Sequence, residues 1–277
     1  MRQEGYLKES FRYFHLKDSA GQERDFHFHD FDKIVILLSG DVTYTVEGQT
    51  YALQPWDVLL VKHHCIHKAI IDRSQDYGRV ILYLDGKFFE RRMPEAGLMR
   101  GFDRADRHCC YRFSPDPRER EELEKLLQQY ETAEKDKRDG SETVKELLVM
   151  ALLVLLNRMV SRQELHVESG EMSYDPKIAE VLSYINENLA SQLDVGRLAE
   201  RVYLSKYHFM RLFKSHTGST VHAYIRQKRL MYAARLIRAG TPASRAAEEA
   251  GFSDYSAFHR AFRESFGIAP GQLRKGT

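Results

Sequence analysis

The C-terminal third of the chain repeats itself, and this repeat constrains the fold more than any other feature. The matched pairs at an offset of 49 residues are Phe209 and Phe258, Arg211 and Arg260, Phe213 and Phe262, Lys214 and Arg263, and Gly218 and Gly267. Five like positions at one offset within ten residues exceed chance in a sequence of this composition. The sequence therefore predicts two copies of one small structural unit.

Each copy reads as a helix, a tight turn and a second helix. In the first copy Asp194 is placed to cap a helix, the chain turns at Tyr203-Leu204, and Ser205 is placed to cap a second helix that ends before Gly218. The corresponding positions of the second copy are Thr241 and Pro242 at the start, Gly251 at the turn, Ser253 or Asp254 at the second cap, and Gly267 at the end. Two helix-turn-helix units are expected.

Helical periodicity separates buried from exposed positions in both second helices. The positions at i, i+3 and i+4, which we assign to the core, are Phe209, Leu212 and Phe213, and Phe258, Ala261 and Phe262. The opposite faces carry the candidate DNA-binding residues, which are Lys206, Tyr207, Met210, Arg211 and Lys214 in the first unit and Tyr255, Ser256, His259, Arg260 and Arg263 in the second.

Arginine and lysine are expected to play different parts on these faces. Because arginine can make a bidentate contact with guanine in the major groove, Arg211 and Arg260 are the predicted base readers. Lys214 and Arg263, one turn further on, are predicted to contact phosphates. The alternative is that all of these are solvated surface residues. Their recurrence in both copies favours DNA binding.

A long helix is predicted between the two units, over residues 221–240. Its length of about 30 Å would hold the two second helices about one DNA turn, near 34 Å, apart. Residues 176–277 hold 16 Lys and Arg against 8 Asp and Glu, although the whole chain has a net charge of only +2. Such a basic block suits a module that neutralises the phosphates of double-stranded promoter DNA.

The region from about Pro176 to Lys275 resembles the DNA-binding domain of AraC/XylS-type transcription regulators. The motifs that carry the resemblance are LAERVYLSKYHFMRLFKSHTG and AAEEAGFSDYSAFHRAFRESFGIAPGQLR. One departure is Leu273, where the family usually has an aromatic residue. The resemblance implies a regulator that occupies promoter half-sites and acts on RNA polymerase, as an activator or a repressor.

The N-terminal region has the pattern of a small β-structure. Short apolar runs cover residues 33–40, 42–48, 50–53, 57–64 and 78–85, and Gly40, Gly48, Pro55 and Gly78 punctuate them. This pattern predicts a barrel or sandwich over residues 1–115. The expected fold class is α+β with two domains, a cupin-like β-barrel with helices followed by an all-α domain over residues 176–277.

The histidines of this region resemble part of a cupin barrel, the effector-binding half of many regulators of the same family. The residues that carry this resemblance are Gly21, His27, His29, Lys33, Gly40, Pro55-Trp56-Asp57 and His67. In metal-binding cupins a glutamate stands where this chain has Lys33, and an ammonium cannot coordinate a metal ion. We therefore expect no metal and no cofactor. The predicted ligand is a small anionic or sugar-like effector bound by His27, His29, Lys33 and His67. The alternative has Lys33 in solvent and purely structural histidines.

Two helices are predicted between the barrel and the repeat, in a segment over residues 116–161. Its second helix has more apolar positions than one buried stripe needs, namely Leu147, Leu148, Met150, Ala151, Leu152, Leu155 and Leu156. This excess predicts a homodimer interface; the alternative is a helix buried wholly within one subunit. The polar run over residues 162–175 is the predicted interdomain linker.

Other classes of function fit the sequence less well. A cupin oxygenase or isomerase would need the missing glutamate, and no other nucleophile and base stand together, so no enzyme is expected. A DNA-repair methyl acceptor would need a reactive cysteine beside a base, which Cys109-Cys110 does not offer. Sparse cysteines, the lack of a signal peptide and the lack of a long apolar run predict a cytoplasmic protein without a membrane span.

Overall fold

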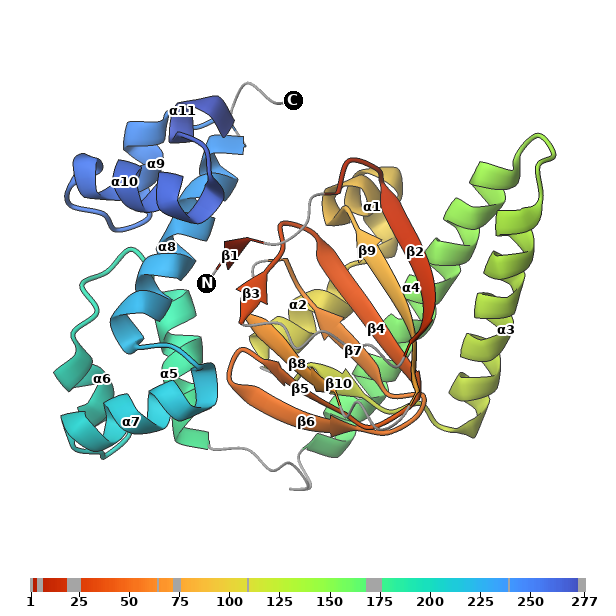
Figure 1. The fold of residues 1–277 in the computed structure, drawn as a ribbon, viewed down its shortest axis with the longest axis horizontal. Coiled ribbons are helices and arrows are strands. Elements are labelled where there is room, and N and C mark those ends of the chain that lie inside the picture. Colours follow the sequence, from red (N-terminus) through yellow and green to blue (C-terminus); the bar gives the residue numbers. More distant parts are fainter. Residues whose placement is uncertain are drawn as a thin grey trace.

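The computed structural model describes residues 2–3, 7–18, 26–63, 65–71, 76–108, 110–167, 176–238 and 240–273. A β-rich N-terminal part lies between a helical hairpin and a helical C-terminal part (Figure 1). The predicted α+β fold with two domains is confirmed. Gly21, Cys109 and Arg274, which the sequence motifs include, lie outside the described residues.

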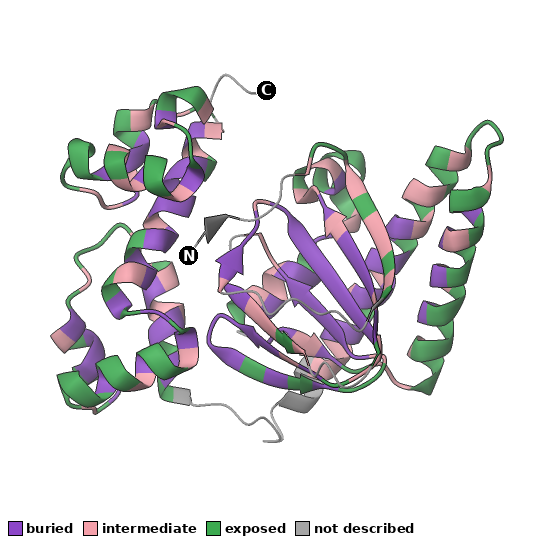
Figure 2. Cartoon of the chain, viewed as in Figure 1, coloured by how far each residue is buried: buried purple, intermediate pink, exposed green. Residues whose placement is uncertain are grey.

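The β-part consists of two five-stranded sheets. The strands are β1 (Arg2–Gln3), β2 (Phe11–Asp18), β3 (His27–Phe28), β4 (Asp32–Ser39), β5 (Val42–Val46), β6 (Gln49–Leu53), β7 (Val58–Val61), β8 (His67–Ile71), β9 (Tyr77–Leu84) and β10 (Arg112–Phe113). One sheet has the order β1-β3-β8-β5-β6 and the other β10-β7-β4-β9-β2. Their facing side chains form one apolar core, so the strands are largely buried (Figure 2).

Strand β4 is the centre of the second sheet and shows why these residues form strands. It pairs antiparallel with β7 on one side and β9 on the other. Ile34, Val35, Ile36 and Leu37 are all fully buried, since one face meets the other sheet and the opposite face meets helices. A run of β-branched and aliphatic residues is typical of a strand covered on both faces.

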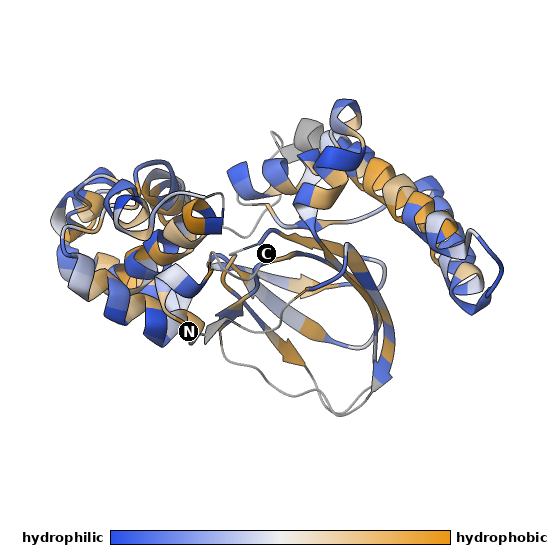
Figure 3. Ribbon diagram, turned by 90° about the horizontal axis from the view of Figure 1, so that it is seen from above, coloured by the Kyte–Doolittle hydropathy of each residue, from blue (hydrophilic) through white to orange (hydrophobic). Residues whose placement is uncertain are grey.

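Helices cover the β-part on its outer side. They are α1 (Gly86–Arg92), the 3-10 turn η1 (Pro94–Ala96), α2 (Arg100–Arg107), α3 (Pro117–Lys135) and α4 (Ser141–Val167). Helix α3 begins with a capping box, in which Asp116 accepts from the N–H of Glu119 and Glu119 accepts from the N–H of Asp116. The hairpin of α3 and α4 extends away from the sheets, with hydrophobic residues along α4 (Figure 3).

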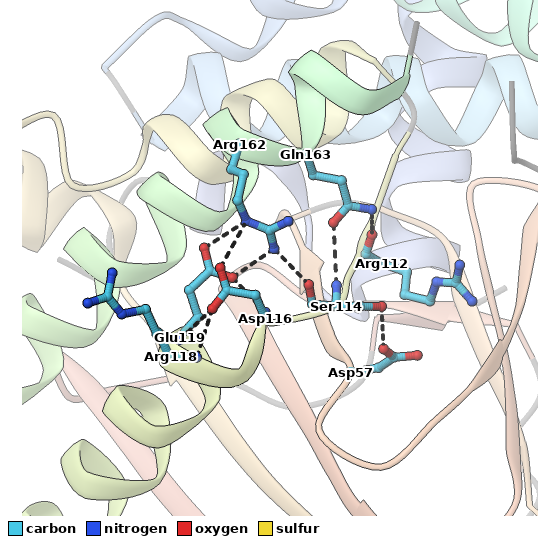
Figure 4. Close-up of polar contacts among 8 residues, drawn as sticks. All are labelled: Asp57, Arg112, Ser114, Asp116, Arg118, Glu119, Arg162 and Gln163. Atoms are coloured by element: carbon cyan, nitrogen blue, oxygen red, sulfur yellow. Dashed lines mark hydrogen bonds and ion pairs between the residues drawn. The ribbon is translucent and has the colours of Figure 1, made fainter. Parts of the chain in front are cut away.

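The far end of α4 is tied to the sheets by polar contacts (Figure 4). Arg162 donates to Glu119 at 2.7 and 3.0 Å and to the carbonyl oxygen of Ser114 at 3.0 Å. The Ser114 hydroxyl donates to Asp57 at 2.6 Å, next to strand β7. Helix α4 continues to Val167, so the first six residues of the predicted linker 162–175 are helical, and the rest lie outside the described residues.

The C-terminal part is helical throughout, as predicted. Its helices are α5 (Pro176–Glu187), α6 (Val195–Arg201), α7 (Lys206–Thr217), α8 (Val221–Arg238), α9 (Ala243–Glu249), α10 (Tyr255–Phe266) and α11 (Pro270–Leu273). The predicted caps Asp194 and Ser205 are confirmed, and Asp254 rather than Ser253 caps α10. Pro242 is the N-cap residue of α9 and makes no side-chain cap, because its ring has no atom that can accept a hydrogen bond from the backbone N–H groups of the first turn.

The two turns between the paired helices use a left-handed residue. Tyr203 has a φ of 55° and Gly251 a φ of 86°. Helix α8 joins the two units and has 18 residues, which corresponds to about 27 Å. Apolar residues of α8 are buried, namely Tyr224, Ile225, Leu230, Ala233, Ala234 and Ile237.

The β-part contacts both helix-turn-helix units directly. The turn between β5 and β6 places Gly48 against His216 and Thr217 at the end of α7. On the other unit, the ring of Phe28 lies 6.2 Å from that of Phe266 in α10. The sheets therefore provide one surface against which both units pack.

A buried ion pair lies at the centre of this contact. The Glu47 carboxylate accepts from Lys228 Nζ at 2.8 Å, from the Ile66 N–H at 2.7 Å, and from the Tyr224 hydroxyl. Glu47 is 2% and Lys228 9% exposed. A second ion pair joins Asp30 to Arg238 at 3.1 Å. The buried charges of Glu47 and Lys228 need partners, and each finds its partner in the other domain, as do the half-buried Asp30 and Arg238.

Candidate functional site

Helices α7 and α10 present the residues that the sequence assigned to DNA. The exposed positions are Lys206, Tyr207, Met210, Arg211 and Lys214 on α7, and Tyr255, Ser256, Arg260 and Arg263 on α10, while His259 is half-buried. The apolar face of each helix packs in the core, since its phenylalanines are fully buried, namely Phe209, Phe213, Phe258 and Phe262. The polar face of each helix is exposed.

Side-chain caps fix the N-terminal ends of both helices. At α7 the Ser205 hydroxyl accepts from the His208 N–H at 3.4 Å, and at α10 the Asp254 carboxylate accepts from the Ser256 N–H at 2.8 Å. Both helices end at a left-handed glycine, Gly218 and Gly267. Arg211 and Arg260 therefore occupy the same position on two helices that each begin with a side-chain cap and end at a left-handed glycine.

Three basic residues of α8, Lys228, Arg229 and Arg238, pair with groups inside the protein, whereas Arg226 and Arg235 are exposed. Arg229 donates to the backbone carbonyls of Leu189, Ser191 and Gly251 at 2.7–2.8 Å, so it joins the first unit to the turn of the second. Lys228 and Arg238 pair with carboxylates of the β-part. From sequence these cations look like part of the basic surface, and only the fold shows their partners.

Three histidines meet inside the β-part. His27 on β3 is in register with His67 on β8, and His29 follows β3 directly. Their ring centroids lie 4.4 to 5.0 Å apart, and all three are at most 4% exposed. The structure therefore brings together three of the four residues predicted to bind an effector.

Among these, His67 is held in one tautomer. Its Nδ1 lies 2.9 Å from the carbonyl oxygen of Cys65. Burial, then the nearby charge of Lys33 and the neighbouring histidines, lower the pKa of His67 well below its ordinary value. The ring is therefore neutral at physiological pH.

Lys33, the fourth predicted residue, lies in the interior as well. It is 6% exposed, and its Nζ lies 5.8 Å from the centroid of the Tyr44 ring on the facing sheet. Within the described part of the chain, no carboxylate pairs with it. The alternative of a solvent-exposed Lys33 is therefore wrong.

A separate cavity of about 880 Å³ lies between the β-part and helix α8. Its β-side is rich in carboxylates, including Asp30, Asp32 and Asp106, and its α8 side carries Lys228 and Arg235. None of the four predicted effector residues lines it. Sequence reasoning missed this cavity and the Glu47 ion pair because both are formed by residues nearly 200 positions apart.

Comparison with protein families gives two matches. Residues 12–153 match the model of the AraC-like ligand binding domain, and residues 198–276 match the model of a helix-turn-helix domain. The first match covers half of the chain. The chain belongs to the AraC family of transcription regulators.

Within the described residues, none of the helices combines the length and apolarity needed to span a membrane.

Individual relatives agree with this membership. The HTH-type transcriptional activator RhaS of Enterobacter sp. (strain 638) is 25% identical over 261 residues, covering 90% of this chain and 87% of the relative. RhaS of Salmonella typhimurium is equally similar.

Two solved structures are also similar. The DNA-binding domain of AdpA, in complex with a target DNA, is 34% identical over 37% of this chain and 92% of that chain, with a TM-score of 0.35. ToxT from Vibrio cholerae is 13% identical over 96% of this chain and 98% of that chain, with a TM-score of 0.39.

Proposed function

We propose that this AraC-type regulator reads its operator with Arg211 and Arg260, and that it responds to an anionic effector held inside the β-part. The assignment to DNA is supported by the exposure of these two arginines, which occupy the same position on α7 and α10. Each can reach a guanine in the major groove, and Lys214 and Arg263 one turn on can neutralise phosphates. The partner is double-stranded promoter DNA, with RNA polymerase recruited or blocked at the same promoter in the cytoplasm.

The effector site is formed by His27, His29, Lys33 and His67. An ammonium buried without a carboxylate partner in the described residues favours an anion. A sugar-like effector would have to carry a carboxylate or phosphate to satisfy it. Because these residues lie on the sheets that contact both DNA-binding units, an effector has a direct route to their arrangement.

The functional unit is a homodimer formed through α4. Most of the apolar excess predicted there is used within the chain, since Met150, Leu152, Leu155 and Leu156 are buried. A stripe remains outside, with Val144 47% and Leu147 58% exposed, Ala151 exposed and Val154 half-buried. Its spacing of three and four residues is that of a helix-pairing seam.

The test of the DNA assignment begins with duplexes selected by the full chain from a random library. Arg211→Ala and Arg260→Ala should each cost about 1–3 kcal/mol on the selected sequence and relax base preference at one position. Lys214→Ala should weaken selected and random duplexes alike. Arg118→Ala, an exposed arginine on α3, is the matched control and should change nothing. Equal losses on selected and random DNA for the two arginine variants would refute base reading.

A further inference from the structure

One ring nitrogen of His67, Nε2, carries a lone pair that no described residue binds. The other, Nδ1, faces the carbonyl oxygen of Cys65, and a carbonyl only accepts. Nδ1 therefore carries the hydrogen, and Nε2 is an acceptor. Nε2 is buried and has no hydrogen-bond partner in the described residues. A lone pair sealed from water in this way needs a donor or a metal ion, and an imidazole whose other nitrogen donates to a carbonyl is oriented as metal ligands are.

Two further imidazoles face the same point. One ligand nitrogen from each of His27, His29 and His67 lies within 4.8 Å of the other two. Nitrogens bound to one zinc ion at about 2.1 Å in tetrahedral geometry lie about 3.4 Å apart, so the rings need to approach one another by at most about 1.4 Å when an ion binds. Imidazole nitrogens are good ligands for zinc, iron, nickel and copper ions. The donor set fits a divalent transition metal.

The backbone holds these donors in place. His27 and His67 are paired across adjacent strands, and His29 lies two residues from His27, so both point to the same side. The ring of His29 also stacks on Phe31 at 4.5 Å. A site on strands with packed rings needs little ordering when an ion enters.

We propose that His27, His29 and His67 bind one divalent transition-metal ion, and that Lys33 pairs with an anionic ligand of that ion. Three neutral imidazoles bring no negative charge, so the ion would keep its full charge inside the sheets. Lys33 adds another positive charge there without a carboxylate partner in the described residues. A carboxylate that coordinates the ion and accepts from Lys33 offsets both.

This assignment gives Lys33 a different place from the one expected from sequence. The sequence places Lys33 where metal-binding cupins have a glutamate ligand, and a lysine ammonium cannot coordinate a metal ion. With three nitrogen donors supplied by histidines, Lys33 is not required as a ligand and instead selects the charge of whatever binds at the open coordination position. The inference rests on the proposed function, because that anion is the effector.

The test uses the full chain, freed of metal by a chelator and titrated with Co²⁺. Co²⁺ with three nitrogen ligands has visible absorption bands that the aqueous ion lacks, and the wild-type protein should develop them at one ion per chain. His67→Gln and His29→Gln should weaken Co²⁺ binding at least tenfold. His222→Gln, an exposed histidine on α8, is the matched control and should bind Co²⁺ as the wild type does. Undiminished binding by His67→Gln would overturn the site.

The part assigned to Lys33 is tested by titrating acetate into the Co²⁺ protein. Acetate should shift the visible bands of the wild type, whereas Lys33→Met should bind Co²⁺ but need at least tenfold more acetate for the same shift. An equal acetate dependence would remove Lys33 from the proposal. If the histidine variants fail to fold by circular dichroism, X-ray absorption of the Co²⁺ wild type decides, and fewer than three histidine nitrogens would overturn the site.

The outcomes for metal and for function are separate. A wild-type chain that takes up no Co²⁺ but binds its selected DNA refutes the metal site and leaves the regulator intact. A chain that takes up Co²⁺ but binds no duplex refutes the proposed DNA function and leaves the metal site standing.

Discussion

Gly251 shows how a single position sets the angle between two helices. It has a φ of 86°, and a Cβ added there would lie 2.8 Å from the carbonyl oxygen of Leu189 and 3.0 Å from the guanidinium of Arg229. Both the backbone conformation and the neighbouring backbone therefore exclude a side chain. Gly267 has a similar φ of 72° but nothing within 4 Å of an added Cβ. Comparing substitutions at Gly251 and Gly267 therefore separates the cost of the left-handed backbone from the cost of steric overlap.

Gly251→Ala should lower the free energy of unfolding by more than about 2 kcal/mol, since overlap adds to a left-handed penalty of about 1–2 kcal/mol. Gly267→Ala should pay the conformational penalty alone, about 1–2 kcal/mol. Guanidinium unfolding followed by circular dichroism compares the two variants with the wild type. An identical loss for both would show that the contact with Leu189 can relax at no cost.

Helix α4 illustrates how an element can serve two surfaces. Its inner face packs on the sheets and on α3, and Arg162 and Gln163 fasten its end beside the Asp116 cap. Its outer stripe is exposed at Val144, Leu147 and Ala151 and ends at Val154, which is half-buried. An apolar stripe of this length is the kind of surface that a second copy can cover.

Leu147→Glu should therefore convert the proposed dimer to a monomer, because a carboxylate in the seam would be removed from water without a partner. Sedimentation velocity measures the change, and the affinity for a two-site operator should fall with it. Gln129→Glu adds the same charge at an exposed position on α3 and is the control. A Leu147→Glu chain that sediments as the wild type does would exclude this face as the dimer interface.

At the scale of elements, the sequence predicts what local signals encode. The repeat, the caps Asp194, Ser205 and Asp254, and the apolar positions of α8 led to the correct helices, because each depends on residues a few positions apart. The short strand β3 and strand β8 carry histidines and a lysine among apolar residues, so no alternation marked them as strands. The burial of Lys33 and of Lys228 depends on facing elements far away in sequence, and no local pattern reports it.

At the scale of the whole molecule, Glu47 and Lys228 join the effector-binding part to the DNA-binding part. Burial lowers the pKa of Lys228, but the charge of Glu47, the charges of Cys65 and Asp106 and the hydrogen bond to Glu47 together raise it above its ordinary value. A raised pKa in the folded state means that the stabilisation is complete at neutral pH and is lost only in strong alkali. Substitution, rather than a rise in pH, is therefore the way to open the contact.

Glu47→Gln and Lys228→Met should each destabilise the contact by about 3–5 kcal/mol, because each leaves one buried charge alone. The double variant should lose less than the sum of the two, since it leaves no charge unpaired. Hydrogen exchange of the peptide that contains Ile66, whose N–H Glu47 accepts, reports opening of the contact. Arg92→Met, which breaks an exposed pair with Glu146, is the control and should cost at most about 1 kcal/mol. Additive effects in the double variant would mean that Glu47 and Lys228 act independently.

Because the Glu47–Lys228 pair is closed off from solvent, dissolved ions cannot shield it as they shield charges at the surface. Protein and phosphate, by contrast, exchange their counterions whenever DNA is bound or released. A rise in cellular potassium would thus loosen the grip on the operator while the two halves of the regulator stayed joined. Osmotic stress and effector would then act on this protein through different bonds.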